Sequence, residues 1–160
     1  MDEAVLELCD TLKHVVPPLK DLNLSKNQIT CKGAVAIADF LAGAYHLKTL
    51  RVGWNKIKSK GGIAIAEALK DNQRLVLFDG SFNQFGIKRN GEFGIKMGEA
   101  CNKGILRHID ISYNSMDKLE CQKFGETIHD NHTIWGLHMM GNDCLVDSMG
   151  FVRTGVKNNM

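Results

Sequence analysis

A nine-residue pattern recurs along this chain with nearly constant spacing. Five times, an asparagine stands eight residues after an apolar residue. The asparagines, called here the Asn ladder, are Asn27, Asn55, Asn83, Asn114 and Asn142. The apolar residues that open the pattern are Leu19, Leu47, Leu75, Leu106 and Ile134, so the units start 28, 28, 31 and 28 residues apart. Such regularity predicts a structural unit that is built several times over.

The second copy indicates what one unit contains. Leu47, Leu50 and Val52 follow a short strand pattern, and segment 61–72 carries apolar residues at helical spacing. Asn55 stands where the chain leaves the strand, and its side-chain amide can satisfy backbone groups that turn inward without a strand partner. One unit therefore holds one strand and one helix, and it can bury its apolar face only against the next unit.

The motif L-x-x-L-x-L-x-x-N resembles that of leucine-rich repeat proteins, in particular their long, ribonuclease-inhibitor-like class. The resemblance covers about residues 19–152. It implies an α/β fold, a right-handed curved solenoid of about five repeats with a parallel β-sheet on the concave face and helices on the convex face. We expect one continuous domain with repeats at 19–46, 47–74, 75–105 and 106–133 and an incomplete one at 134–160. Such a fold implies no single function.

The two ends of the chain are expected to differ from the repeats. Pro17 and Pro18 end an amphipathic segment whose apolar face holds Val5, Leu8, Leu12 and Val15. We therefore expect a capping helix or half repeat over residues 1–18. At the other end we expect no dedicated cap, so that this end is frayed, covered by a partner or the cut edge of a longer protein.

Two repeats depart from the pattern. In the third, Gly80 replaces an aliphatic strand residue, and three additional residues fall most naturally in loop 84–94, which we expect to protrude. In the fourth, Glu120 replaces the glycine that stands six residues after the asparagine in the first two repeats. Gly33 and Gly61 at that position would relieve the turn into the helix or allow close packing.

Composition and terminal sequence restrict the class of protein. The acidic start lacks a basic leader, and no stretch approaches the roughly 20 apolar residues of a membrane span. A formal net charge of +2 gives no argument for nucleic acid. Reduced thiols are expected for the widely spaced Cys9, Cys31, Cys101, Cys121 and Cys144. We expect a soluble, eukaryotic, cytoplasmic protein, with the cytoskeleton or a cilium as its candidate location, and no membrane, nucleic-acid or small-molecule partner.

No pattern of catalytic or metal-binding residues stands out. His129 and His132 are three residues apart, but a closed metal site needs four ligands and no matching pair exists. Ser112 shares a strand segment with His108 and Asp110, without a nucleophile elbow or an oxyanion-hole motif. The sequence therefore predicts a protein that is not an enzyme and has no metal or cofactor.

Strand residues that point away from the core should form columns across the repeats, because side chains alternate across a strand. The third motif position holds Asp21, Thr49, Leu77, His108 and Gly136. The fifth position holds Asn23, Arg51, Asp79, Asp110 and His138. The seventh position holds Ser25, Gly53, Ser81, Ser112 and Met140. This mixed polar face favours a protein ligand over a lipid, and a merely solvated sheet face is the alternative.

The eighth motif position adds aromatic residues at the rim of the concave face. It holds Lys26, Trp54, Phe82, Tyr113 and Gly141. The three aromatic residues, called here the aromatic strip, should stack at the strand spacing of about 4.8 Å. Rim aromatics are candidate anchors for a partner. Packing over the loop is the alternative interpretation, and it is similar to the ordinary consensus of the family.

Basic residues gather on the loops that follow the first three strands. The residues called here the basic ridge are Lys56, Lys58, Lys60, Lys88 and Arg89. Stacked repeats would bring these loops together, and the ridge would then attract an acidic protein surface and speed the encounter. Solvated loop lysines without a binding role are the alternative.

These features favour a non-enzymatic protein–protein interaction module or scaffold that uses the concave sheet and adjoining loops. A cytoskeletal or ciliary role is suggested, because the basic ridge could meet acidic tubulin tails or another part of a larger assembly. A GTPase activator is the alternative, since some ribonuclease-inhibitor-like repeat proteins have that activity. Arg51 or Arg89 could then stabilise phosphoryl transfer in trans, although neither matches a catalytic motif of the family.

Overall fold

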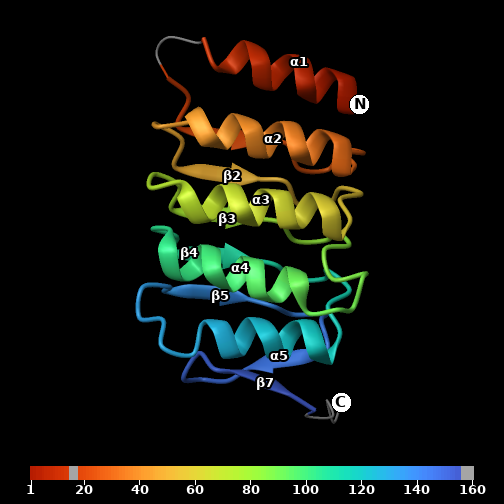
Figure 1. Cartoon of the computed structure of the whole chain (residues 1–160), viewed down its shortest axis with the longest axis vertical. Helices are drawn as coiled ribbons and strands as arrows, with labels where there is room; N and C mark the ends of the chain where they lie inside the picture. The colour runs from red at the N-terminus through yellow and green to blue at the C-terminus, as the bar shows by residue number, and fades with distance from the viewer. Residues whose placement is uncertain (15–17, 156–160) are drawn as a thin grey trace.

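A computed structural model describes residues 1–14 and 18–155 of the chain. Within these residues, helices and parallel strands alternate before a final hairpin (Figure 1). The helices are α1 (Asp2–Leu12), α2 (Cys31–Gly43), α3 (Ser59–Asp71), α4 (Glu92–Lys103) and α5 (Lys118–Thr127). The strands are β1 (Asp21–Asn23), β2 (Thr49–Arg51), β3 (Leu77–Asp79), β4 (His108–Asp110), β5 (Gly136–His138), β6 (Cys144–Val146) and β7 (Val152–Thr154).

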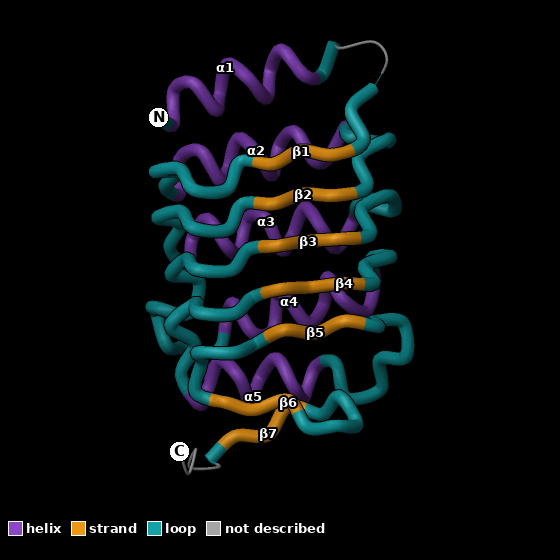
Figure 2. Tube along the Cα trace, turned by 180° about the vertical axis from the view of Figure 1, so that it is seen from behind, coloured by secondary structure: helices purple, strands orange, loops and turns teal. Residues whose placement is uncertain are grey.

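The first five strands form one parallel sheet in the order of the sequence. Each pair of neighbouring strands is joined through a helix, which is the long connection that parallel pairing requires. Figure 2 shows the five strands side by side with the helices behind them. The open face of the sheet, opposite the helices, is called the concave face below. This arrangement confirms the expected β-α solenoid of about five repeats.

The core lies between the sheet and the helix layer. The fourth motif position supplies a column of buried side chains, with Leu22 exposed by 7% and Leu50, Phe78 and Ile109 by 0%. From the helices, Ile65 and Leu69 are also buried. Complete burial of one such side chain stabilises the fold by about 1.5–3 kcal/mol. The apolar pattern therefore fixes which face of each unit turns inward.

The Asn ladder runs along one side of the core. The side-chain amide of Asn83 donates to the carbonyls of Val52, Gly80 and Ser81, and its oxygen accepts from the N–H of Ile57. Asn55 and Asn114 repeat this arrangement one unit away on either side. In the inner repeats these side chains therefore satisfy main-chain groups of their own repeat and of the preceding one.

Large aromatic core residues account for the glycine in the strand of the third repeat. A Cβ atom at Gly80 would lie 2.7 Å from the ring of Phe85 and 2.8 Å from that of Phe78. Gly62 on α3 faces the same Phe85 ring. Residues 87–90 are exposed, so the lengthened loop projects as expected.

Glu120, which replaces the turn glycine in the fourth repeat, is fully buried. Its carboxylate accepts hydrogen bonds from the N–H groups of Gly91 and Gly94, at 3.0 and 2.8 Å. These groups lie at the start of α4, which has no capping side chain of its own. Burial raises the pKa of the Glu120 carboxyl, although the backbone hydrogen bonds oppose the shift. Glu120 therefore caps the helix of the neighbouring repeat.

Helix α1 packs against α2 and differs in one respect from the expectation. Val5 and Cys9 are buried, whereas Leu8 is 36% exposed, so the inclusion of Leu8 in the buried face is wrong. The inward face of the helix therefore runs from Val5 through Cys9 to the partly buried Leu12. Asp2 of α1 accepts hydrogen bonds from the N–H and the hydroxyl of Thr30, the residue before α2. The expectations for Val15 and Pro17 lie outside the described residues.

A β-hairpin follows the last repeat strand. Strands β6 and β7 are antiparallel, and Val152 of β7 packs against Gly125 of α5. Asp147 fixes the turn by accepting hydrogen bonds from the N–H groups of Met149 and Phe151. The expectation of an end without a cap is therefore wrong on the helix side. Nowhere in residues 1–14 and 18–155 is a helix long and apolar enough to span a membrane.

Candidate interaction site

The concave face carries the predicted columns in register. Asp21, Thr49, Leu77, His108 and Gly136 are direct partners on successive strands, as are Asn23, Arg51, Asp79, Asp110 and His138. All ten residues retain solvent exposure. The two rows form a continuous polar surface with Leu77 as an aliphatic point.

The fifth column also shapes the turn that follows each strand. Side-chain oxygens of Asp79 and Asp110 accept from the N–H groups of Ser81 and Ser112, at 3.0 and 2.9 Å. Both serines are 7% exposed. Gly53 in the same column is buried as well, so the outward exposure expected for the seventh column is wrong at these three positions, because the chain already turns inward there. Met140, in the same column, is 70% exposed.

Two histidines lie side by side at the C-terminal end of the concave face. The rings of His108 and His138 are 4.8 Å apart between centroids, with an angle of 41° between their planes. Gly136 is the direct neighbour of His108, and a Cβ atom there would collide with the His108 ring. The missing side chain thus leaves room for the pair.

The aromatic strip is a continuous stack. The ring centroids of Trp54 and Phe82 are 3.8 Å apart, and those of Phe82 and Tyr113 are 4.3 Å apart, with 14° between the planes in both pairs. Trp54 is 52% exposed and Tyr113 is 42% exposed. A Cβ atom at Gly141 would collide with the Tyr113 ring. The strip both packs over the loops, as the alternative interpretation held, and presents aromatic surface to solvent.

The backbone of the strip adopts an uncommon conformation. Trp54, Phe82 and Tyr113 have φ angles of 56°, 53° and 53°, in the left-handed region. Bulky residues rarely occupy this region, because Cβ crowds the backbone there. The next residue in each case belongs to the Asn ladder, whose hydrogen bonds hold the turn. The conformation is a product of the repeat and could not be inferred from residue type.

The basic ridge lies along the edge where the helices begin. Lys56, Lys58, Lys60, Lys88 and Arg89 are all exposed. Lys88 pairs with Glu92 at 3.5 Å, and the other four have no acidic side chain within 4.0 Å in the described part of the chain. Figure 1 shows that α2, α3 and α4 start on the same side of the molecule. The positive ends of the helix dipoles therefore reinforce the charge of the ridge.

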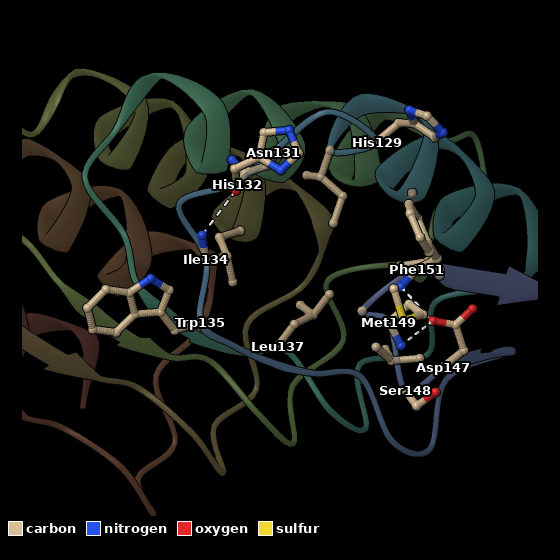
Figure 3. Close-up of a pocket in the computed structure, with 15 residues that line it drawn as sticks. His129, Asn131, His132, Ile134, Trp135, Leu137, Asp147, Ser148, Met149 and Phe151 are labelled. Atoms are coloured by element: carbon tan, nitrogen blue, oxygen red, sulfur yellow. Dashed lines mark hydrogen bonds between the residues drawn. The ribbon is translucent and has the colours of Figure 1, made fainter.

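A cavity at the C-terminal end was not foreseen from the sequence. It has a volume of about 450 Å³ and lies between the end of α5, segment 131–137 and the β6–β7 turn (Figure 3). Trp135 beside it is 86% exposed, with the Arg107 guanidinium 5.8 Å from the ring centroid. Met149 is 78% exposed. The apolar residues that line the cavity follow the last regular helix in the sequence. They are brought together only by the hairpin, so the sequence alone did not reveal the cavity.

The residues considered for chemistry do not form a reaction centre. His129 contacts Asp130 at 2.9 Å, and within the described residues no three histidine, cysteine or acidic side chains are grouped for a metal ion. Ser112 is buried. All five cysteines are free, and burial raises the pKa of the Cys9 thiol to about 11, which disfavours the reactive thiolate.

The repeated motif, the parallel sheet and the alternating helices define a leucine-rich repeat fold. A family model described as leucine-rich repeat matches residues 17–38 and 46–66. No curated protein matches the chain. Among 46 matching chains of solved structures is one described as leiomodin-1 actin-binding site 2. Its TM-score is 0.67 at 17% identity, over 83% of this chain and 77% of the other. At this identity the likeness is one of fold.

Proposed function

We propose that this chain is a non-enzymatic interaction module that binds an acidic protein partner through the concave face, the aromatic strip and the basic ridge. The observation that most supports this proposal is the exposed stack of Trp54, Phe82 and Tyr113. Aromatic side chains have few rotatable bonds and bury a large area, so they are frequent hot spots of protein interfaces. Residues 1–18 would act as a cap in one continuous domain with the repeats.

The kind of partner is proposed from charge. Among the described residues, four ridge residues have no acidic side chain within 4.0 Å, and they lie at the same edge as the helix starts, which favours a partner with an acidic surface or tail. Filaments of the cytoskeleton have such surfaces, and the fold is similar to one described as an actin-binding site. We therefore propose a cytoplasmic scaffold on actin filaments or on microtubules, including those of cilia.

Affinity capture with matched variants tests the aromatic strip. The bait is the native chain or a Trp54→Gly/Tyr113→Gly variant, incubated with eukaryotic lysate and, separately, with purified actin filaments and microtubules. Glycine is chosen because the φ angles at both positions suit it. Tyr45→Ala, which removes another exposed aromatic residue, is the control. We expect partners bound by the native chain and the control to be lost by the strip variant.

The salt dependence of binding tests the basic ridge. Replacing Lys58, Lys60 and Arg89 by glutamine should slow association with an acidic partner about tenfold at low salt. The two proteins should converge at high salt, because exposed charges are screened there. A folded strip variant that retains every partner, or a ridge variant with unchanged association at low salt, would contradict the proposal.

The second candidate, a GTPase activator, has one specific observation in its favour. Arg89 is exposed on the lengthened loop and has no acidic partner within 4.0 Å among the described residues. Single-turnover GTP hydrolysis by candidate GTPases, with the native chain and with Arg89→Ala, tests it. Acceleration that the variant lacks would favour activation, and no acceleration removes the candidate.

A further inference from the structure

Strand β5 is an edge strand with main-chain groups left open. At the sixth motif position of the first four repeats, the N–H donates to the next strand at 2.7–2.9 Å. The four bonds are Leu24 to Arg51, Val52 to Asp79, Gly80 to Asp110 and Ile111 to His138. Met139 holds the same position after β5, and its N–H has no partner within residues 1–14 and 18–155. The hydrogen-bond series thus stops with its next donor unpaired among these residues, although Met139 itself is buried, with 2% of its surface exposed.

At the start of β5, a main-chain carbonyl also lacks, within the described residues, the partner that its counterparts in the earlier repeats have. The carbonyls at the second motif position each accept from the following repeat, and they belong to Lys20, Lys48, Val76 and Arg107. Trp135 holds this position in the last repeat, and its carbonyl has no main-chain partner in the described segments. Acceptor and donor therefore alternate along the open edge as they do in the interior of the sheet.

The apolar surface beside this edge is uncovered as well. Leu137 and Ile134 are only half-buried. Their counterparts one repeat earlier, Ile109 and Leu106, are exposed by 0% and 1%. At the opposite end of the sheet, Leu22 is buried, with only 7% of its surface exposed. Strand β7 of the hairpin packs against α5, and β6 turns back beside β5 without pairing with it, so within the described residues β5 has no hydrogen-bonded strand on this side.

Unfilled space borders β5 on both faces of the sheet. The cavity of Figure 3 lies on the helix side, and a second one of about 480 Å³ lies on the concave side. Leu137 and Val146 line both of them. In Figure 2, β6 stands apart from β5, whereas β1 to β5 lie side by side. Trp135 projects at the start of this open edge.

We infer that the open edge of β5 accepts an extended segment of a protein partner as a sixth, parallel strand. Only another main chain presents donors and acceptors at the strand repeat of about 3.3 Å per residue. The interface continues the one that already joins β1 to β5, and it requires apolar side chains at alternate positions to cover Ile134 and Leu137. The inference goes beyond the proposed function, because it depends on neither the aromatic strip nor the basic ridge.

The chain's own second strand supplies a defined probe. A synthetic peptide, LKTLRVGWN, has the sequence of residues 47–55 and carries leucine and valine at the inward positions. In the sheet, third-position N–H groups donate backward, for example Leu77 to Lys48 at 3.0 Å and Gly136 to Arg107 at 3.0 Å. N-methylation of the peptide at its third and fifth residues should therefore abolish binding. N-methylation at its fourth and sixth residues, whose N–H groups face away, is the matched control.

Hydrogen exchange of the isotopically labelled chain reads out the site. At a peptide concentration ten times its Kd, exchange at the Met139 amide should slow about tenfold. The control peptide should give the same protection, and the peptide methylated at the third and fifth residues should give none. A Leu137→Lys variant should weaken binding at least about tenfold, with Leu8→Lys as the control on an exposed helix position.

Several outcomes of these experiments would contradict the addition of a sixth strand. Absence of binding at millimolar peptide, protection confined to the aromatic strip, or equal binding of the two methylated peptides would each refute strand addition. Self-association of the chain with protection of Met139 in the absence of peptide would also refute it, because a second copy would then be the occupant. If Leu137→Lys fails to fold, lysine in place of the peptide's fourth residue tests the same contact.

Discussion

At the scale of single residues, this fold depends on buried polar side chains that serve neighbouring repeats. Asn114 is fully buried, and its amide spans the carbonyls of Gly80, Ile111 and Ser112. Its oxygen accepts from the N–H of Phe85. Burying any of these three carbonyls or the Phe85 N–H without a partner would be costly. The Asn114 side chain avoids this cost because it forms a hydrogen bond with each of them.

Replacing this asparagine should therefore be expensive. We expect Asn114→Ala to lower the free energy of unfolding by about 3 kcal/mol, because buried carbonyls and an N–H lose their partner. The control is Asn27→Ala, which removes a half-buried amide bonded to Leu24 and Ser25 and should cost about 1 kcal/mol. Urea unfolding of both variants measures the difference. Equal costs would contradict the bridging role.

Glu120 should give stability a characteristic pH dependence. Its pKa is raised in the folded state by burial, so its contribution is fully present below the pKa of the unfolded chain and is lost as pH rises through the folded value. We therefore expect the free energy of unfolding of the native chain to fall, relative to Glu120→Gln, as pH rises from about 4. Other carboxyls cancel in this comparison. If the free energy of unfolding of the native chain instead rises with pH relative to that of Glu120→Gln, the hydrogen bonds from Gly91 and Gly94 would stabilise the carboxylate more than burial destabilises it.

At the scale of elements, the aromatic strip joins three turns into one surface. Phe82 lies between Trp54 and Tyr113, and every ring depends on a left-handed residue for its direction. The stack spans repeats that are adjacent in space and about 28 residues apart in sequence. A change at its centre therefore affects packing and backbone energy together.

Two substitutions of Phe82 separate these effects. Both Phe82→Ala and Phe82→Gly remove the ring, but glycine tolerates the φ angle of 53° at no steric cost. We expect the glycine variant to be more stable than the alanine variant by about 1 kcal/mol, the reverse of their usual order inside helices and strands. Thermal unfolding measures the difference. A more stable alanine variant would show that the turn can relax to negative φ.

At the scale of the whole molecule, the main contacts between elements of the described residues join neighbouring repeats, and the two ends differ. Helix α1 lies against α2, whereas the hairpin leaves Leu137 and Ile134 half-buried. In such arrays, terminal repeats open more easily than central ones. The C-terminal repeat is therefore the weaker end.

Hydrogen exchange can test this gradient with equivalent amides. The N–H of Val52 donates across β2 and β3, and that of Ile111 donates across β4 and β5. We expect Ile111 to exchange at least about tenfold faster than Val52 in the free chain. Equal protection would show that the solenoid opens as one unit.

The sequence predicted the repeated architecture because period and alternation depend on local residue type. The register of Asp21, Thr49 and Leu77 follows directly from the motif. The choice of Cys9 over Leu8 as a buried residue did not, because helix rotation is set by packing. The hairpin and its cavity were missed, since no motif encodes Val152 against Gly125. The function of the aromatic strip stays a prediction.

The cap that Glu120 provides for α4 bears on how arrays of this kind can be lengthened or shortened. Helix α4 receives its acceptors from the following repeat, and Thr30 before α2 is held by Asp2 from the preceding helix. A gene duplication or deletion cut between the third and fourth repeats would separate α4 from the side chain that caps it. We therefore expect a viable seam for recombination to avoid this boundary, so that the third and fourth repeats are inherited together.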